Sequence, residues 1–88
     1  MTEERLIEIL NEDSHPDFIG DMEVEVIKLL RDRIPLSEAG RIIQGAEHDK
    51  IWLPDVSVAA KFLSEEDAAM LRDLLVGVED DEYLYMFV

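Results

Sequence analysis

Two histidines lie next to carboxylates, and they are the residues best placed for acid–base or metal chemistry. His15 lies between Asp13 and Asp17, and His48 is flanked directly by two acids. A histidine beside a carboxylate can serve as a general base or as a metal ligand. Neither histidine belongs to an HExxH pattern, a Gly-rich phosphate loop or a GxSxG elbow. These are sequence motifs of known metal-binding or catalytic sites. We therefore expect no enzymatic activity, no cofactor and no metal site.

Two other binding motifs are excluded by their spacing. The acid-rich run 13–23 lacks the alternating oxygen ligands and the sixth-position glycine of a calcium-binding loop. Residues 37–63 contain two helical patterns, but about ten residues separate them where a helix-turn-helix unit has three or four. The second pattern offers only Lys61 as a base. The sequence therefore indicates neither a calcium site nor a DNA-reading helix.

The strongest chemical feature of the chain is its negative charge. Its 88 residues include 22 acids and 8 Lys or Arg, which give a net charge of −14. The surplus is divided between residues 1–25, with nine acids and one base, and residues 51–88, with nine acids and two bases. Residues 26–50 are close to neutral. Because this charge repels phosphate backbones and anionic lipids, we expect no direct binding to nucleic acid and no membrane association.

The negative charge is larger than solubility requires, since a net charge of about 2 to 8 keeps a small domain soluble. A domain of this length is roughly 31 Å across, and duplex DNA presents about nine phosphates on one side over that distance. Half of the net charge on one face would place about seven negative charges in a similar area. The sequence therefore predicts a non-enzymatic protein that binds and inhibits a basic, nucleic-acid-handling partner by presenting carboxylates in place of phosphates, like DNA-mimic inhibitors of phages and mobile elements.

The carboxylates expected to contact this partner fall in several stretches of the chain. Glu4, Glu8 and Glu12 lie four residues apart, so a helix would place them in a ridge along one side. Like charges at this spacing oppose helix formation by roughly 0.2–0.5 kcal/mol per pair, a cost that a purely structural helix would avoid. Further acids continue the interval or begin later elements. The full predicted set is Glu4, Glu8, Glu12, Asp13, Asp17, Asp21, Glu65, Glu66, Asp67, Glu79, Asp80, Asp81 and Glu82.

Other interpretations of the same composition are left open. The chain is equally suited to covering a basic toxin, as an antitoxin or immunity-type inhibitor does. It also suits an adaptor that binds through an apolar patch near Trp52 and the C-terminal strand, with its acidity incidental. The acidity could also serve solubility alone, in which case the carboxylates have no partner. A homodimer is compatible with each of these interpretations.

Length and composition indicate one small globular domain, residues 1–88, because half of the chain could not enclose a core of its own. Hydrophobic residues make up 48% of the chain, which is enough to fold. The absence of cysteine excludes a disulfide scaffold and suits a reducing compartment. The acidic start, residues 1–4, is unlike the basic start of a secretion signal, and no apolar run approaches 18 residues. We therefore expect a cytoplasmic protein.

Apolar residues at intervals of three and four predict about five short helices. Thr2 is suited to cap a first helix over residues 3–12. Ser14 and Pro16 are suited to start a second helix that runs to about residue 32. These two helices would account for most of the first third of the chain.

Three further helices are expected in the rest of the chain. A third helix over 38–44 is predicted to stop at Gly45, and a fourth is predicted over 55–63. Ser64 followed by three acids is the clearest start signal in the sequence. It predicts a fifth helix that ends at Gly77.

Two apolar, β-prone segments complete the chain. A free apolar segment at residues 83–88 would be an aggregation site, so we expect it to pair with residues 50–53 or to dock on the helices. The fold class expected from the sequence is therefore mainly α, with about five short helices. The alternative is α+β, with a small two-stranded sheet formed by residues 50–53 and 83–88.

Overall fold

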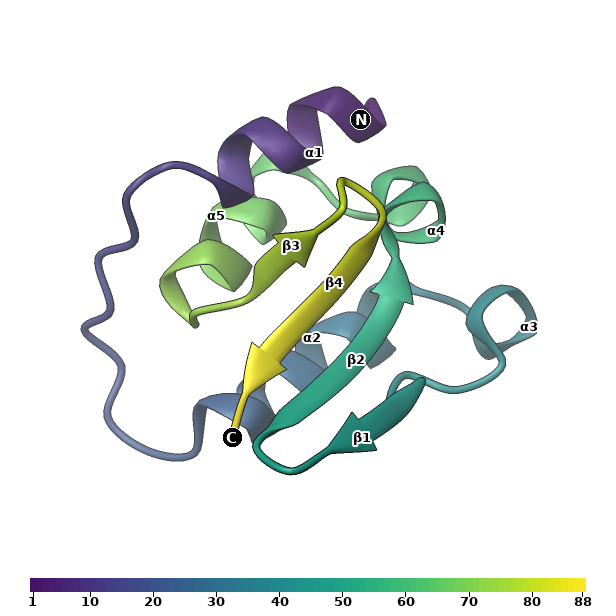
Figure 1. The fold of residues 1–88 in the computed structure, drawn as a ribbon. Helices are drawn as coiled ribbons and strands as arrows, with labels where there is room; N and C mark the ends of the chain where they lie inside the picture. Colours follow the sequence, from purple (N-terminus) through teal and green to yellow (C-terminus); the bar gives the residue numbers. More distant parts are fainter.

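The computed structural model describes residues 1–88 and has two layers, in which helices cover one face of an antiparallel sheet (Figure 1). The helices and strands are α1 (Glu3–Leu10), α2 (Met22–Arg33), α3 (Leu36–Ala39), β1 (Gly45–Glu47), β2 (Lys50–Asp55), α4 (Val56–Phe62), α5 (Glu65–Asp73), β3 (Gly77–Glu79) and β4 (Tyr83–Phe87). The strand order is β1-β2-β4-β3, and the face of the sheet toward the viewer in Figure 1 is uncovered. None of the helices has the length and apolar character that a membrane crossing requires.

The core lies between the sheet and the helices. Strand alternation directs Leu53 of β2 and both Leu84 and Met86 of β4 toward the helices, where all three are buried. They belong to one cluster with Leu6 of α1 and Leu71 of α5. The same alternation leaves Lys50 and Trp52 of β2, and Tyr83, Tyr85 and Phe87 of β4, on the uncovered face.

Two predicted helix starts are confirmed by their capping hydrogen bonds. The Thr2 hydroxyl accepts a hydrogen bond of 3.0 Å from the backbone N–H of Arg5 at the start of α1. At the start of α5 the Ser64 hydroxyl accepts from the backbone N–H of Asp67 at 3.0 Å, and the Asp67 carboxylate accepts from the Ser64 N–H at the same distance. This reciprocal pair is a capping box, so local chemistry alone places this helix start.

The fold class is α+β, so the expectation of a mainly α fold was wrong. The segments around Trp52 and Tyr85 do pair as antiparallel strands, but they are the centre of a four-stranded sheet. The edge strands β1 and β3 have three residues each, and both begin with glycine. Strands this short with little β-propensity form only because the central strands offer them hydrogen-bonding partners. Such strands leave almost no signal in the sequence.

The second helix begins at Met22, later than the sequence predicted, and residues 11–21 have no regular secondary structure. Gly20 has a φ of +135°, which lies outside the helical region. Phe18 and Ile19 fit the helical interval, but both are exposed, and Ile19 is 96% exposed. Because helices in proteins are stabilised mainly by packing of their apolar face, a start signal without a buried face does not form a helix.

The third helix is also shorter than predicted. α3 is a single turn that ends at Gly40, which has a φ of +75°, so the predicted helix over 38–44 was too long. Gly45, the predicted stop, is the first residue of β1 instead. Ile42 lies outside the helix and is buried in the core. The apolar spacing therefore correctly indicated that Ile42 is buried, but it wrongly indicated that Ile42 lies in a helix.

The end of α5 has a leucine where the sequence predicted a glycine stop at Gly77. Leu75 adopts a left-handed conformation with a φ of 69°. Its N–H donates to the Arg72 carbonyl at 3.0 Å, and the Val76 N–H donates to the Leu71 carbonyl at 2.9 Å. This is a Schellman motif, in which the left-handed position usually belongs to glycine. Leu75 therefore carries a conformational cost that glycine would not.

We expect Leu75→Gly to be more stable than Leu75→Ala by about 0.5–1 kcal/mol, because glycine adopts positive φ without a steric penalty even after its larger unfolded-state entropy is included. The alanine variant is the control for loss of the half-exposed leucine side chain. Urea unfolding of both variants gives the difference in free energy of unfolding. Equal stability of the two variants would mean that the helix end relaxes and that Leu75 is unstrained.

Candidate functional site

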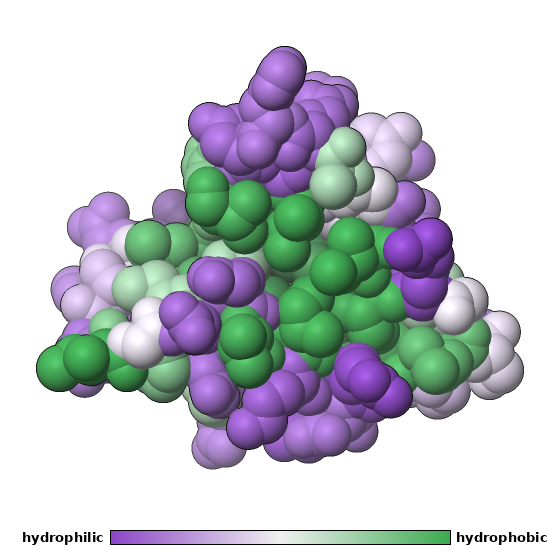
Figure 2. Space-filling view, turned by 90° about the horizontal axis from the view of Figure 1, so that it is seen from below, coloured by the Kyte–Doolittle hydropathy of each residue, from purple (hydrophilic) through white to green (hydrophobic).

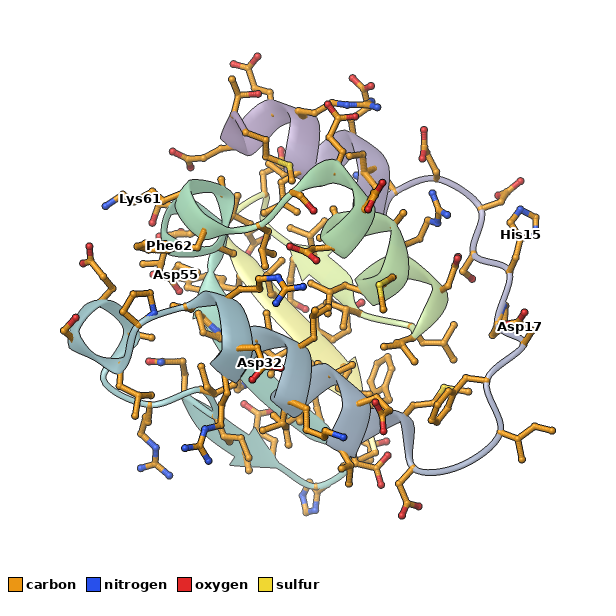
Figure 3. The ribbon with its side chains drawn as sticks, turned by 180° about the vertical axis from the view of Figure 1, so that it is seen from behind. His15, Asp17, Asp32, Asp55, Lys61 and Phe62 are labelled. Atoms are coloured by element: carbon orange, nitrogen blue, oxygen red, sulfur yellow. The ribbon has the colours of Figure 1, made fainter.

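The two histidines singled out in the sequence do not come together with other groups into a site. His15 and His48 are both exposed, and His15 lies on the segment between α1 and α2. Figure 3 shows His15 and Asp17 on this segment at one side of the molecule, far from Asp55. No group of three or more His, Asp or Glu side chains is arranged to hold a metal ion. The backbone N–H of His15 donates to the Asp73 carboxylate at 3.0 Å, which ties the segment to α5.

The carboxylate ridge predicted on the first helix is largely paired with bases. Glu8 forms an ion pair with Arg5, and Glu12 forms one with Arg72 at 2.8 Å. Glu4 is exposed and has no basic partner. The predicted helix over 3–12 was too long, because α1 ends at Leu10 and Glu12 lies beyond it. The ridge on α1 therefore consists of Glu4 and Glu8, and only Glu4 is unpaired.

The acids at the start of α5 have three different environments. Glu65 pairs with Arg5 at 2.8 Å, and the hydrogen bond from Arg5 together with its charge lowers the pKa of Glu65. Glu66 is exposed and unpaired. Asp67 is buried, accepts from Arg33 at 3.1 Å and forms the capping box with Ser64. Of the three, Glu66 alone is a free surface carboxylate.

The remaining predicted carboxylates lie in two exposed places. Asp13, Asp17 and Asp21 lie on the irregular segment, so the interval of four does not align them as it would on a helix. Asp80 and Asp81 form the turn between β3 and β4 with left-handed φ values of 55° and 53°. Glu82 follows in the same turn, whereas Glu79 is paired with Lys50 at 2.9 Å. The ion pairs of the predicted set involve Glu8, Glu12, Glu65, Asp67 and Glu79. Binding of a partner by this set stays a prediction.

The uncovered face of the sheet carries a row of aromatic side chains, which we call the aromatic row: Trp52, Tyr83, Tyr85 and Phe87. The alternate residues of β4 project to this face, and Trp52 of β2 lies opposite Tyr85 in the register. The Trp52 ring centroid lies 5.9 Å from that of Tyr83 and 6.0 Å from that of Tyr85. Tyr85 and Phe87 are 5.5 Å apart and edge-on, and Phe87 is 62% exposed. These contacts make one continuous aromatic surface that faces solvent.

A cation already lies on this surface. The ammonium nitrogen of Lys50 is 4.3 Å from the Trp52 ring centroid and 4.4 Å from that of Tyr85. The same nitrogen donates to the Glu79 carboxylate at 2.9 Å, and this hydrogen bond raises the pKa of Lys50 against the opposing effect of desolvation. Aromatic faces attract cations through their ring quadrupole. The aromatic row and the Glu79 carboxylate thus both contact the ammonium group of Lys50.

A cavity of about 370 Å³ opens at the Trp52–Tyr83 end of the aromatic row. It is lined by Gln44, Trp52, Leu53, Asp55, Glu79 and Tyr83. The negative charge of Glu82 raises the pKa of Tyr83, and Asp55 and Asp80 act in the same direction. The cavity is therefore an aromatic pocket in a negative field.

Two glycines lie beside the aromatic rings, and only Gly77 is required there by close packing. A Cβ on Gly77 would lie 2.9 Å from Cζ of Tyr85, so the Tyr85 ring occupies the space that a side chain would fill. Gly45, opposite Trp52 in β1, would place a Cβ 3.6 Å from the Trp52 ring, which is an ordinary contact. The predicted role of Gly77 as a helix stop is replaced by this packing role.

Sequence reasoning placed an apolar patch near Trp52 and the C-terminal strand but missed the polar groups that surround it. The alternation of Tyr83, Tyr85 and Phe87 is the signal that one face of the strand is aromatic. Asp55 and Glu47 were not among the predicted site residues. They are brought to this face by the pairing of strands, and the sequence around each residue does not indicate that pairing.

Comparison with known proteins gives no relative from which to infer a function. No protein-family model matches the chain, and neither a curated protein nor a solved structure matches it.

We expect Gly77→Ala to displace the Tyr85 ring and so to shift the fluorescence emission of Trp52, the only tryptophan. Overpacking of this kind costs about 1–3 kcal/mol when neighbours cannot move, and less when a ring can swing into solvent. Gly45→Ala is the matched control, because its Cβ meets the Trp52 ring at an ordinary distance. Identical spectra for the Gly77→Ala variant and the unmodified protein would contradict this packing.

We expect Asp67→Asn to lower stability at neutral pH by about 1–2 kcal/mol and to flatten the loss of stability in acid. Burial opposes ionisation of Asp67, but the hydrogen bonds from Ser64 and Arg33 outweigh it and lower the pKa. A lowered pKa contributes stability above the unfolded-state value of about 3.9, and this contribution is lost as pH falls through the folded-state pKa.

Urea unfolding of both proteins between neutral pH and acid measures this difference. The gap between the unmodified protein and Asp67→Asn should close as pH falls, because general charge effects act equally on both. A constant gap would mean that Asp67 does not titrate with folding.

Proposed function

We propose that this protein is a non-enzymatic binding module that docks a basic segment of a partner protein on the uncovered face of its sheet. The observation that carries the proposal is the aromatic row beside the carboxylates that face it. An exposed row of aromatic rings offers large contact area at low entropic cost, which is typical of binding surfaces. The module would therefore combine apolar contact with selection for positive charge.

The charge around the aromatic row supports a basic partner. The carboxylates that act on Lys50 or Tyr83 are those of Glu47, Asp55, Glu79, Asp80 and Glu82. Lys50 is the one base whose ammonium group contacts the rings. A second copy of this chain would bring another negative face against the first, so the same charge disfavours self-association at this surface.

Single-stranded nucleic acid also stacks on aromatic platforms, but the charge argues against it here. Platforms that bind nucleic acid combine stacking with a positively charged groove that follows the phosphates. The aromatic row is surrounded by carboxylates, and the whole chain carries a net charge of −14. A protein segment rich in Arg or Lys meets both the rings and the carboxylates favourably.

The cavity between Trp52 and Tyr83 would receive one cationic side chain of the partner. Its volume of about 370 Å³ is at the small end of ligand pockets and suits the end of a single long side chain. The rings would contact the flat face of a guanidinium group, while Asp55 and Glu79 would accept its hydrogen bonds. Lys50, held by Glu79 and two rings, is an internal example of the same chemistry.

The predicted inhibitor of a nucleic-acid-handling protein would use such a surface if its target presented a basic segment. An antitoxin that covers a basic toxin would do the same. Phosphate imitation is a narrower idea, because it needs free carboxylates at phosphate-like spacing. It stays a prediction, and the aromatic row gives no support to that part of it.

The proposal is tested by titrating a short blocked peptide that alternates arginine with threonine while the fluorescence of Trp52 is recorded. The control peptide has glutamine in place of arginine. We expect saturable binding of the arginine peptide, and we expect Tyr83→Ala to weaken it by about tenfold through loss of one pocket wall. Leu36→Ala, which removes an exposed apolar side chain elsewhere, should leave binding unchanged.

Charge alone must be separated from the aromatic contribution, because any arginine peptide is attracted to this protein. Tyr83→Ala leaves the net charge unchanged, so a difference in affinity reports the pocket. Equal affinity of the Tyr83→Ala, Leu36→Ala and unmodified proteins would overturn the proposal and leave only nonspecific attraction. Unfolding curves for each variant establish that the comparison is made between folded proteins.

A further inference from the structure

A second surface of the molecule combines exposed apolar side chains with unpaired arginines, and we call it the α2 groove. Two adjoining cavities of about 370 and 340 Å³ run along α2 and share Ile27, Arg31 and Ile43. Figure 2, which views the molecule from below, shows hydrophobic side chains gathered in the middle of this face. The apolar residues that line the two cavities are Val24, Ile27, Leu36, Ile42, Ile43, Ile51 and Val88.

Positive charge predominates among the lining residues of the α2 groove, whereas the cavities beside Trp52, Phe18 and Glu38 are lined by acids and no base. Arg31, Arg41 and Lys61 are the bases without a carboxylate within 4.0 Å, and the first two line the groove. Lys28 lines it as well but is paired with Glu25 at 3.9 Å, and Glu23 is the one acidic side chain in the lining. A chain with a net charge of −14 thus leaves two arginines without a carboxylate partner beside an apolar groove. This combination fits an occupant that is both apolar and acidic.

The chain itself contains a segment with this chemistry, residues 17–21. Its sequence places Phe18, Ile19 and Gly20 between two aspartates, neither of which forms an ion pair. Ile19 is 96% exposed, the largest exposure among the apolar side chains. The segment belongs to the stretch between α1 and α2, which stands away from the rest of the molecule in Figure 1. Ile19 therefore buries almost none of its apolar surface within one copy of the fold.

The segment is positioned on a different side of α2 from the groove. Phe18 lines a cavity with Glu25 of α2 and Leu74 at the end of α5, while Val24 and Ile27 of α2 line the groove. The hydrogen bond from the His15 N–H to Asp73 ties the same stretch to α5. A copy of the chain therefore holds its own segment on the α5 side and leaves its own groove open.

We propose that the α2 groove receives residues 17–21 of a second copy of this chain. Ile19 would enter the apolar floor of the groove, and Asp17 and Asp21 would pair with Arg31 and Arg41. This contact brings the negative segment against the two unpaired arginines of the groove, whereas two acidic surfaces meeting elsewhere would oppose like charges. At about 0.15 M salt the Debye length is about 8 Å, so the remaining negative charge is screened while the contact itself persists.

The contact is heterologous, because it joins two different surfaces. If each copy inserts its segment into the groove of the other, the result is a closed dimer, and otherwise it is a chain of copies. The inference is independent of the proposed function, because it uses none of the aromatic row.

Sedimentation and light scattering from micromolar to millimolar protein test this inference. We expect concentration-dependent association that Ile19→Ser weakens by at least about tenfold, the effect of losing one buried isoleucine side chain. Arg41→Glu should weaken it similarly. Lys61→Glu is the control for net charge, and Phe87→Ser is the control for loss of an exposed apolar side chain.

Mixing two defective variants gives the sharpest measurement. Ile19→Ser keeps an intact groove and Arg41→Glu keeps an intact segment, so an equal mixture contains one unmodified segment–groove pair that neither variant has alone. We expect this single pair to give association in the mixture above that of the weaker variant alone. A monomer at every concentration would overturn the inference, as would equal weakening by Lys61→Glu and Arg41→Glu. Weakening by the groove variant without any effect of Ile19→Ser would also overturn it, because another segment would then be the occupant. Ile19→Ser should still bind the arginine peptide, because the uncovered face of the sheet is unchanged in this variant. This measurement tests the proposed function separately from self-association.

Discussion

The pairing of β2 with β4 is the constraint on which the rest of the structure depends. It joins Trp52 to Tyr85 across the sheet and so gives both strands the same division into two faces. Leu53 and Leu84 project inward, where they complete a core that the helices could not close by themselves. The short strands β1 and β3 exist only as additions to this central pair. The buried layer and the aromatic face therefore arise from one pairing.

Only a minority of the carboxylates form ion pairs with Lys or Arg. Arg5 bridges α1 to α5, Arg72 of α5 pairs with Glu12 just beyond α1, and Arg33 joins α2 to the buried Asp67. These pairs link helices that are distant in sequence, and the buried one has geometry that satisfies a charge inside the protein. Most other acids are solvent-exposed and repel one another, which lowers stability. The protein thus keeps a surplus of charge that folding does not need, and the aromatic row lies within it.

Local chemistry predicted those elements whose ends are fixed by their own side chains. Thr2 and Ser64 satisfy backbone donors within three residues, so the starts of α1 and α5 follow from the sequence. The irregular segment before α2 was mistaken for helix because Phe18 and Ile19 match a helical interval that no packing partner supports. Leu75 shows the reverse, since a left-handed helix end is imposed on a residue that does not favour it. In both cases tertiary contacts determine the backbone conformation, and such contacts cannot be recognised from neighbouring residues in the sequence.

The sequence by itself determined the charge, the helical stripes, two helix caps and the alternation of aromatic residues in the last strand, because each depends on residue type and near spacing alone. Only the tertiary structure decided which carboxylates are neutralised, since Glu12 and Arg72 are 60 residues apart. It also brought Lys50 and Glu79 to the aromatic row and placed Arg31 and Arg41 beside one groove. These meetings depend on strand order and helix packing, which are properties of the whole chain and are not written in any window of its sequence.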